Sequence, residues 1–520
     1  MDSVFHLNED DDVAIARADL AVGAVIDKAV TDKAVTDKAV TNTAVTARNA
    51  VPRGHKIATR AISTGEPVRK YGQTIGFATR DIAAGDHVHS HNLEFREFDR
   101  DYAYGVDARP TAFIPEAERA TFDGYVRADG KVGTRNYVAI ICSVNCSATA
   151  AKLIVDRFRG SALEEYPGID GVVALTHTLG CGTAGAGNYG FDVFRRTLTG
   201  YANHPNIVGV LALGLGCEVN QINDLINGWE MPPDRPLSWM TIQELGGTRK
   251  TVAEGESRVR EMLTNASGLK RQKVPASKLV LGMECGGSDG YSGITANPAL
   301  GAAADLLIRN GGIAAFGETT EIYGAEHLLT RRAASRAVGE KLIDRIHWWE
   351  EHVKRDGTSI DNNPSPGNKE GGLTTILEKS LGAAAKGGTT ALTDVVEYAE
   401  PLTTPGLTFM DTPGYDPVNA TGLVAGGATV MCFTTGRGSV FGCKPTPSMK
   451  LATNTPMYDH MSEDMDVNCG VVADGEKTIE EMGQIIFDRI LETASGKQTK
   501  SEELGFGDEE FAPWSLATTV

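Results

Sequence analysis

The run Val138-Ala139-Ile140-Ile141-Cys142, followed by the helical pattern of residues 148–158, decides the fold class of this chain. An unbroken apolar run is typical of a strand that is buried on both faces. In the segment after it, Ala151, Leu153, Ile154 and Phe158 recur at helical spacing. Similar apolar runs occur at 172–175, 207–213, 279–283, 311–316 and 429–433, with helical patterns at about 299–309 and 480–491. Strands that alternate with helices pair in parallel, so we predict an α/β fold with two Rossmann-like parallel-sheet domains.

The chain has 520 residues, which is too long for one ordinary domain. Residues 1–97 contain short strand-like runs separated by glycine turns, and we expect a small β domain there. A linker with Pro110 and Pro115 follows at 98–119. We assign 120–272 to the first α/β domain and 273–520 to the second.

A tandem repeat interrupts the small β domain. The unit Asp-Lys-Ala-Val-Thr occurs three times between Asp27 and Thr41 and fades into Asn42-Thr43-Ala44-Val45-Thr46. A five-residue period fits neither a helix nor a strand. We predict a surface loop at 27–46, with a stacked short β element as the alternative.

The charge and the cysteine content limit the kinds of partner and the cellular location that we expect for this protein. Lysine and arginine number 50 and aspartate and glutamate 68, giving a net charge of −18. Such a surface repels nucleic acid and anionic membranes, and an anionic substrate needs a local cationic pocket. Eight cysteines in a chain of this length favour a reduced, cytoplasmic protein, and no secretory signal or membrane-spanning run is found.

Three cysteines follow strand-like runs in glycine-rich turns. They are Cys181 in Gly180-Cys181-Gly182, Cys217 in Gly214-Leu215-Gly216-Cys217-Glu218, and Cys285 in Cys285-Gly286-Gly287-Ser288-Asp289-Gly290. Ligands of α/β folds bind at the carboxyl ends of strands. We predict that these thiolates converge on one iron centre, either Fe²⁺ or an Fe–S cluster, although a single free cysteine is more often a buried apolar residue. Cys142 and Cys146 are spaced for a metal, but a buried pair is the preferred interpretation.

Histidines and basic residues give further candidates. His87, His89 and His91 alternate, so a strand would place all three imidazoles on one face, for a metal, for proton transfer or simply for solvent. Arg135, Lys369 and Arg437 stand in glycine-containing or polar loops where a guanidinium or ammonium group can bind a carboxylate. Glu318, Glu321, Glu326 and His327 are possible acid–base or metal groups, with an acidic helix start as the default.

Taken together, several long segments resemble the altronate/galactarate dehydratase family of sugar-acid hydro-lyases. The matching segments are Gly124-Tyr125, 130–136, Gly180-Cys181, 214–218, 285–289, 292–298, 363–369, Gly371-Gly372 and 434–438. The N-terminal unit resembles the SAF domain of that family, which has a β-clip fold. The ending His87 to Asn92 is similar to altronate dehydratases, whereas Thr134 and residues 142–147 and 182–184 are closer to galactarate-type relatives.

The resemblance implies loss of water from a 2,3-dihydroxy acid, giving a 2-keto-3-deoxy acid. Iron is the implied metal, with Mn²⁺ as an alternative. A metal and cationic side chains stabilise the negative charge that develops when the C2 proton leaves, and a general base takes that proton. The residues we assign are metal ligands Cys181, Cys217 and Cys285; catalytic groups His89, His177 and Lys369; and substrate-binding groups Arg135, Asn136, Ser288, Asp289 and Arg437.

Altronate is the expected substrate, and self-association of the chain is left open. The alternatives are a galactarate dehydratase and a sulfolactate sulfo-lyase of the same superfamily. A non-catalytic sugar-acid sensor is disfavoured by the number of polar glycine loops. A dinucleotide-dependent oxidoreductase is disfavoured because no Gly-x-Gly-x-x-Gly follows a first strand.

Overall fold

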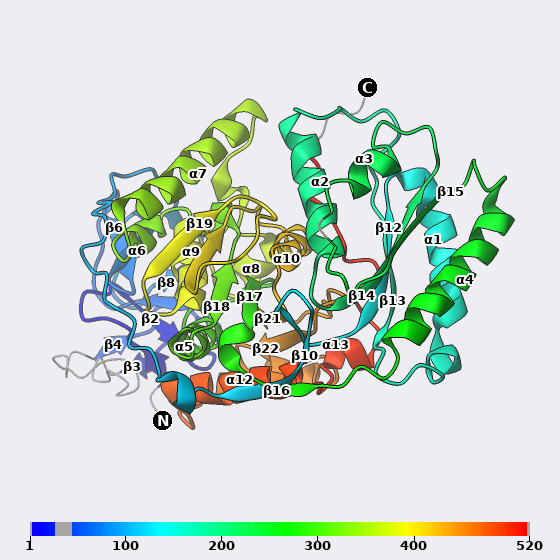
Figure 1. Ribbon diagram of the computed structural model, residues 1–520. Helices are drawn as coiled ribbons and strands as arrows, with labels where there is room; N and C mark the ends of the chain where they lie inside the picture. The colour runs from blue at the N-terminus through cyan, green and yellow to red at the C-terminus, as the bar shows by residue number, and fades with distance from the viewer. Residues whose placement is uncertain (1–2, 27–43, 230, 517–520) are drawn as a thin grey trace.

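The computed structural model describes residues 3–26, 44–229 and 231–516. Figure 1 shows a left-hand body, formed by a small β unit and the larger α/β domain, and a right-hand α/β domain. Residues 27–43 of the predicted loop 27–46 lie outside the described residues, whereas Val45–Thr46 at its end form strand β4, which pairs antiparallel with β3 (Val25–Ile26).

The N-terminal unit is built from short antiparallel strands. Beyond β3 and β4, they are β1 (Val4–Phe5), β2 (Val13–Ala16), β5 (Lys56–Ala58), β6 (Pro67–Lys70), β7 (Gln73–Ala78), β8 (His87–Val88) and β9 (Leu93–Glu94). The order β1-β2-β5-β8 places the His87 strand next to the Lys56 strand. This confirms the predicted small β domain.

The first α/β domain has a four-stranded parallel sheet of order β13-β12-β14-β15. Its elements are β12 (Tyr137–Cys142), α1 (Ala148–Val155), β13 (Gly171–Leu175), α2 (Tyr189–Ala202), β14 (Ile207–Gly214), α3 (Ile222–Ile226), β15 (Leu237–Thr241) and α4 (Thr248–Ala266). The apolar run Val138–Cys142 lies in the interior strand β12, which is buried throughout. Helices α1 and α4 cover one face and α2 the other, and Leu153 of α1, expected on the apolar side, is exposed.

An antiparallel ribbon connects the two α/β domains. Strand β10 (Thr121–Val126) pairs with β11 (Val132–Gly133) and with β16 (Gln272–Pro275), which runs back from the first domain. The linker before β10 is attached to the second domain, because Arg100 forms a 2.8 Å ion pair with the buried Glu326.

The second α/β domain has a seven-stranded parallel sheet of order β19-β20-β18-β17-β21-β22-β23. The strands are β17 (Val280–Cys285), β18 (Ile313–Phe316), β19 (Leu392–Val396), β20 (Gly406–Met410), β21 (Val430–Thr435), β22 (Ser448–Ala452) and β23 (Val467–Asn468). The helices are α5 (Ala296–Arg309), α6 (Glu326–Thr330), α7 (Arg336–Arg355), α8 (Pro366–Glu370), α9 (Ile376–Ala384), α10 (Asp416–Ala425), α11 (Thr455–His460), α12 (Ile479–Ala494) and α13 (Lys500–Glu503). Two parallel-sheet domains after a small β domain confirm the predicted fold class.

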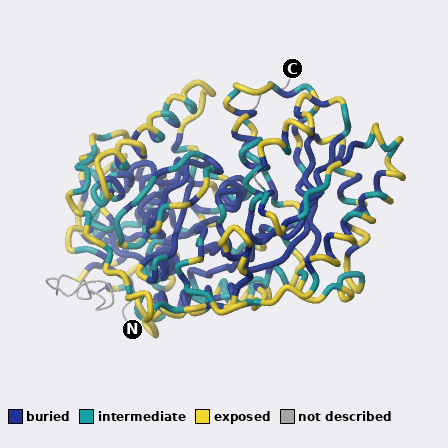
Figure 2. Tube along the Cα trace, viewed as in Figure 1, coloured by how far each residue is buried: buried dark blue, intermediate teal, exposed yellow. Residues whose placement is uncertain are grey.

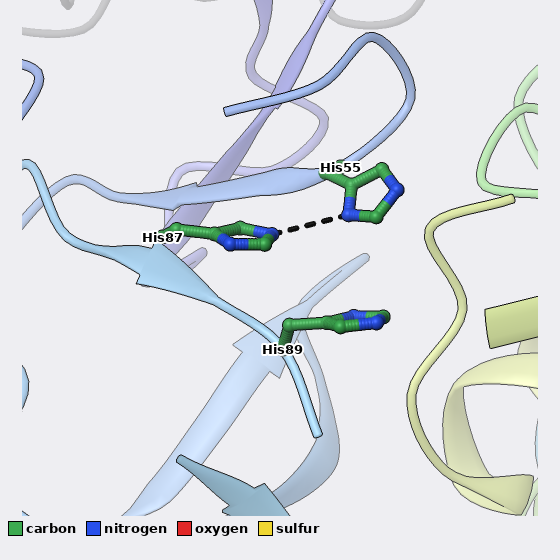
Figure 3. A group of neighbouring side chains, drawn as sticks. All are labelled: His55, His87 and His89. Atoms are coloured by element: carbon green, nitrogen blue, oxygen red, sulfur yellow. Dashed lines mark hydrogen bonds between the residues drawn. The ribbon is translucent and has the colours of Figure 1, made fainter. Parts of the chain in front are cut away.

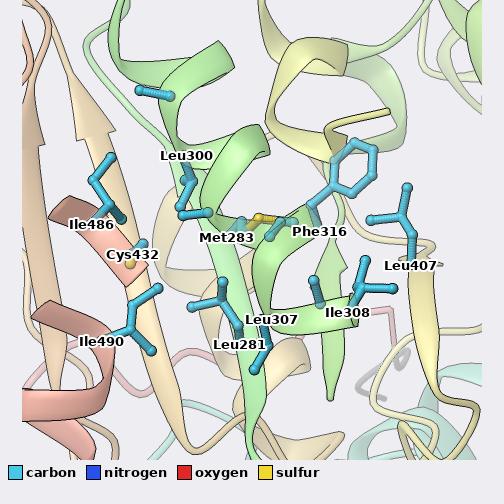
Figure 4. Close-up of a cluster of buried hydrophobic side chains, with 14 of the residues drawn as sticks. Leu281, Met283, Leu300, Leu307, Ile308, Phe316, Leu407, Cys432, Ile486 and Ile490 are labelled. Carbon is cyan, nitrogen blue, oxygen red and sulfur yellow. The ribbon is translucent and has the colours of Figure 1, made fainter. Parts of the chain in front are cut away.

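The core of the second domain lies between its sheet and helices α5 and α12. In Figure 4, Leu281 and Met283 of β17 face Leu300 and Leu307 of α5, and Ile486 of α12 lies beside them. Figure 2 shows the same division in both domains, with buried strands inside and helices exposed on their outer faces. Burying such side chains contributes roughly 1.5–3 kcal/mol each. The rigid sheets hold the loops at their carboxyl edges in place.

Candidate functional site

A buried acid–lysine cluster lies at the carboxyl edge of the seven-stranded sheet. Cys285 ends β17, and Glu318 follows β18, the adjacent strand. The ammonium group of Lys386 lies 2.8 Å from Cys285 Sγ and 2.8 Å from Glu318 Oε2. All three residues are buried. Burial opposes ionisation of Cys285, whose pKa lies well above its usual range, so the group is a thiol at neutral pH.

Glu318 is held in the left-handed backbone region, with φ of 67°. This conformation costs a non-glycine residue of order 1–3 kcal/mol and persists where surrounding contacts fix it. Thr412, which follows β20, accepts the Glu318 backbone N–H at 2.7 Å. The local strain therefore serves to point one carboxylate at Lys386.

Further carboxylates surround this ion pair. Lys379 of α9 pairs with Glu321 at 2.8 Å, and Asn363 donates to the same carboxylate at 2.6 Å. Burial raises the pKa of Glu284, with Glu318 adding to the effect, and burial together with Glu318 raises the pKa of Asp416 to about 7. Two groups of three have ligand atoms within 4.8 Å of one another, namely Cys285, Glu318 and Glu321, and Glu284, Glu318 and Asp416. The ammonium group of Lys386 already pairs with Glu318, so these carboxylates have a positive partner without a metal ion.

Three histidines of the N-terminal unit form the second cluster, shown in Figure 3. His55, His87 and His89 each offer a ring nitrogen within 4.8 Å of the others. His55 Nδ1 lies 3.1 Å from His87 Nε2, and the rings of His87 and His89 are stacked with an interplanar angle of 11°. His55 Nε2 lies 3.0 Å from the carbonyl oxygen of Glu370, so this nitrogen donates and Nδ1 offers a lone pair.

The histidine cluster has the chemistry of a metal site. Burial lowers the pKa of His87 to about 3, and burial followed by the charge of Lys56 lowers that of His89 to about 4, so both imidazoles are neutral at pH 7. His89 Nδ1 is buried without a hydrogen-bond partner among the described residues. A ligating histidine usually donates its other nitrogen to a carbonyl or carboxylate, as His55 does. These residues fit a divalent transition metal.

The N-terminal unit is fixed to the second domain by a buried ion triad. Lys56 and Lys70 lie 2.8 Å and 2.9 Å from the two oxygens of Glu378 on α9. Lys56 also donates to the carbonyl oxygen of Gly372 at 2.5 Å. The histidine cluster is therefore held beside α8 and α9 of the second domain.

The loop from Cys285 to Gly290 connects the two clusters. It starts at the Lys386 ion pair and ends beside the His55 turn, where Gly290 donates to the carbonyl oxygen of Gly371 at 2.7 Å. A Cβ at Gly290 would collide with the carbonyl oxygen of Gly54, so this position requires glycine. Asp289 holds the loop in shape through Ser292, Thr453 and Asn454.

Two residues expected to bind substrate have structural positions instead. Arg135 is fully buried at the amino end of β12, with every guanidinium nitrogen bonded to Glu502 or to backbone carbonyl oxygens. Asn136 bonds to Arg127 and to the carbonyl oxygen of Gly168. Neither side chain reaches the carboxyl edge, since both precede the strand.

The remaining basic and polar candidates lie near the connecting loop. Arg437 follows β21, donates its backbone N–H to Gly287 and pairs with the exposed Glu370 at 3.2 Å. The Ser288 carbonyl oxygen accepts from Asn368, and Ser288 is buried. Lys369 lies on α8, half-buried, next to the residue whose carbonyl oxygen contacts His55.

The structure does not bring Cys285 together with Cys181 and Cys217. Cys285 belongs to the seven-stranded sheet and is buried, whereas the other two follow β13 and β14 of the four-stranded sheet and are exposed. His177 is also structural, because Nε2 lies 3.0 Å from the Cys142 carbonyl oxygen and Nδ1 accepts from Leu179. Cys146, expected to be buried, is exposed in the same region.

Sequence reasoning missed His55, Lys379 and Lys386. His55 lies in the turn Gly54-His55 before a strand, and its meeting with His87 depends on pairing of β5 with β8. His91, expected to share the face of His87 and His89, is exposed because β8 ends at Val88 and the chain turns. Lys386 stands alone among alanine and glycine residues, and this small apolar context could have indicated that its ammonium group is buried.

The fold and the site define a class of α/β enzyme in which a small β domain brings a histidine cluster to the carboxyl edge of a parallel sheet. Residues 2–96 match the altronate/galactarate dehydratase SAF domain, 124–267 the second domain of D-galactarate dehydratase/altronate hydrolase, and 276–519 the C-terminal domain of D-galactarate/altronate dehydratase. The chain belongs to the altronate/galactarate dehydratase family.

Individual relatives are similar over most of their length. An altronate dehydratase of Bacillus subtilis is 35% identical over 476 residues, covering 91% of this chain and 93% of the relative. A galactarate dehydratase (L-threo-forming) of Escherichia coli is 38% identical over 466 residues, covering 88% and 89%. The beta subunit of a (2R)-sulfolactate sulfo-lyase of Chromohalobacter salexigens is 34% identical over 393 residues, covering 75% of this chain and 96% of the subunit. Within the described residues, no helix combines the length and the apolar character needed to cross a bilayer.

Proposed function

We propose that this chain is a hydro-lyase that removes water from a sugar acid, with altronate as the substrate and a 2-keto-3-deoxy acid as the product. The observation that carries the proposal is the position of His55, His87 and His89, which hold three neutral imidazoles at the loop leading from the Cys285 cluster. Membership of a dehydratase family supports the reaction class.

We propose that the three histidines hold Fe²⁺. Imidazole ligands suit iron better than manganese, which prefers oxygen ligands, so Mn²⁺ is the weaker alternative. A bound divalent metal would polarise the carboxylate and hydroxyl of the substrate and stabilise the enolate charge. This gives His89 the role of a ligand and leaves His177, bonded to backbone at both nitrogens, in a structural role.

The chain itself supplies the charges around the substrate. Arg437 is exposed beside the connecting loop and, among the residues that the structure describes, has only the exposed Glu370 as its ion-pair partner, so its guanidinium group can bind a substrate carboxylate. Lys369 is a second cation at the same place. Buried Lys386 adds a fixed positive charge at the carboxyl edge, which favours the build-up of negative charge after the C2 proton leaves.

Dehydration is favoured over carbon–sulfur cleavage by the extent of the similarity. The altronate dehydratase match includes most of this chain, whereas the sulfo-lyase relative is a beta subunit that matches 75% of it. Galactarate remains the second candidate substrate, because the galactarate dehydratase relative is as similar as the altronate one. We also propose a cytoplasmic location, consistent with eight free thiols.

The test is a substrate comparison. The protein is purified anaerobically, supplied with Fe²⁺, and incubated separately with altronate, galactarate and sulfolactate, with keto acid and sulfite measured. We expect keto acid from altronate. Keto acid from galactarate alone would transfer the assignment to that substrate, sulfite would establish the sulfo-lyase, and no product from any of the three would reject the lyase function.

A further inference from the structure

Three cysteines outside the proposed catalytic site lie at the ends of neighbouring strands. In the sheet order β13-β12-β14, Cys181 follows β13, Cys146 follows β12 and Cys217 follows β14. Because the strands are parallel and adjacent, the three turns emerge at one edge of the sheet.

Backbone and side-chain hydrogen bonds tie the three turns together. Asn145, next to Cys146, donates its backbone N–H to the Leu179 carbonyl oxygen at 2.9 Å. Val219, close to Cys217, donates to the carbonyl oxygen of Cys181 itself at 3.0 Å. The turn after β13 is thus fixed to the turn after its neighbour β12 and also to the turn after β14, on the other side of β12.

Two buried side chains anchor this arrangement. Glu218 accepts from the Ser143 hydroxyl at 2.5 Å and from the Gly216 backbone N–H at 2.6 Å, which joins the Cys217 turn to the end of β12. His177 bonds to the carbonyl oxygen of Cys142 and joins the Cys181 turn to the same strand. These are positioning residues, because each holds a cysteine turn against the end of β12.

The exposure of these thiols separates them from the other cysteines. Cys146, Cys181 and Cys217 are exposed, while the other five cysteines are buried. A free cysteine without a function is usually buried as a small apolar residue. Beside the exposed thiols, Thr183 Oγ1 and Asn220 Oδ1 are buried without a partner among the described residues. The Thr183 hydroxyl can therefore donate to a sulfide, and the Asn220 oxygen can accept from a ligand.

The cysteine edge faces the same side of the molecule as the acid–lysine cluster. Helix α2 packs beside α10 (Figure 1). Near the ends of these helices, Gly200 of α2 lies close to the backbone of Ala425 of α10. Burial, followed by the carboxylates of Glu397 and Asp411, raises the pKa of Tyr189 to about 12. Arg196 of α2 pairs with Glu397 at 3.5 Å and with Glu400 at 3.6 Å, and both carboxylates follow β19, so the helix after the Cys181 turn lies against the carboxyl end of a strand of the seven-stranded sheet.

We propose that Cys146, Cys181 and Cys217 ligate a [4Fe–4S] cluster, which leaves one iron open to an oxygen ligand. Soft thiolates select iron–sulfur clusters, zinc or copper(I). Each thiol loses its proton on ligation, and no redox change of the protein is required. This ligand set differs from the one predicted from the sequence: Cys146 takes the place of Cys285, which lies in the other α/β domain.

The test measures iron and acid-labile sulfide in the full chain after anaerobic purification and reconstitution, together with the electron paramagnetic resonance spectrum after reduction. We expect sulfide in the wild type and, in each of Cys146→Ser, Cys181→Ser and Cys217→Ser, a loss on the order of 10-fold or more. Cys142→Ala and Cys285→Ser are matched controls that keep the sulfide. Circular dichroism establishes that each variant is folded.

Several outcomes would overturn the cluster. They are stoichiometric zinc without sulfide in the wild type, unchanged sulfide in the three serine variants, or loss of sulfide in Cys285→Ser alone. The result is separable from the proposed function: keto acid without sulfide rejects the cluster only, and sulfide without turnover of any sugar acid rejects the function only. His55→Ala is expected to keep the sulfide while losing the histidine-bound ion.

Discussion

Lys56 of the SAF domain and Glu378 of helix α9 form an ion pair of 2.8 Å in which both side chains are almost completely buried. Lys70 occupies the other carboxylate oxygen at 2.9 Å. Since the histidine strand β8 pairs with the Lys56 strand β5, this contact sets where the imidazoles stand relative to the second domain. The triad is thus the link between the docking of one domain and the geometry of the proposed metal site.

Replacing Glu378 by alanine should strongly destabilise the protein. The substitution leaves two buried ammonium groups without their partner, and breaking a buried pair in this way costs about 3–5 kcal/mol. Urea denaturation followed by circular dichroism measures the change. Arg48→Ala is the control, because the Arg48 side chain is 62% exposed and its pair with the half-buried Asp86 is worth less than about 1 kcal/mol. Equal effects of the two variants would contradict the role of the triad.

The same carboxylate predicts a pH dependence of stability. Burial disfavours the charged form, but Lys56 and Lys70 outweigh it and lower the pKa of Glu378 from its ordinary value of 4.5 to about 2. A depressed carboxyl pKa contributes stability that is complete above the unfolded value and is lost as the pH falls toward 2. We expect the unfolding free energy of the wild type to fall more steeply between pH 5 and 2 than that of Glu378→Gln. Parallel curves would show that the triad does not titrate in this way.

Lys386→Met should remove activity while a matched lysine variant keeps it. Lys386 is the cation between Cys285 and Glu318, and loss of one preorganised charge costs roughly 10²–10³ in kcat. Lys450→Met is the control, since Lys450 is equally buried in β22 but bonds to the Phe441 carbonyl oxygen. Steady-state turnover of altronate, alongside thermal melting, separates the two. A similar loss of kcat in both variants would assign Lys386 to stability alone.

The fold could be predicted from the sequence because parallel strands are buried on both faces. The apolar runs at Val138–Cys142 and Ile207–Leu213 therefore mark β12 and β14 directly. The apolar pattern of a single strand does not indicate which other strands it pairs with in the sheet. The relative position of Cys285 and Cys181 could not be predicted for this reason, and the structure places them after β17 and β13, strands of different sheets.

The site was less predictable because its contacts cross domains. His55 meets His87 only through strand pairing, and Lys386 meets Cys285 only when the segment after α9 folds back onto the sheet. The alternation of His87 and His89 did indicate a common site. His91 leaves it because the His89 backbone N–H bonds to the Asn92 side chain at 2.9 Å and closes a turn.

Alanine substitutions of His55, His87 and His89 should weaken metal binding. Each removes one of three imidazoles whose nitrogens lie within 4.8 Å, and loss of a ligand should cost at least the roughly 10–100-fold in affinity found for outer partners. Anaerobic calorimetric titration with Fe²⁺ and with Mn²⁺ measures the affinity. His91→Ala is the control, because its ring lies beside His87 but is exposed and outside the group. Unchanged affinity in the three ligand variants would remove the metal from this site.

Arg135 and Arg437 should separate stability from substrate binding. In Arg135→Lys the bidentate pair with Glu502 and several carbonyl contacts are lost inside the protein, so we expect destabilisation of about 3–5 kcal/mol with an unchanged KM in the folded fraction.

In Arg437→Ala an exposed side chain is removed, so stability should change by less than about 0.5 kcal/mol. Its KM for altronate should rise roughly 10-fold or more, since a hydrogen bond to a charged group contributes about 1.5–3 kcal/mol. The two variants are compared by denaturation and by initial rates over a range of altronate concentrations. A raised KM in Arg135→Lys at full stability would return that residue to the substrate site, and an unchanged KM in Arg437→Ala would take Arg437 out of it.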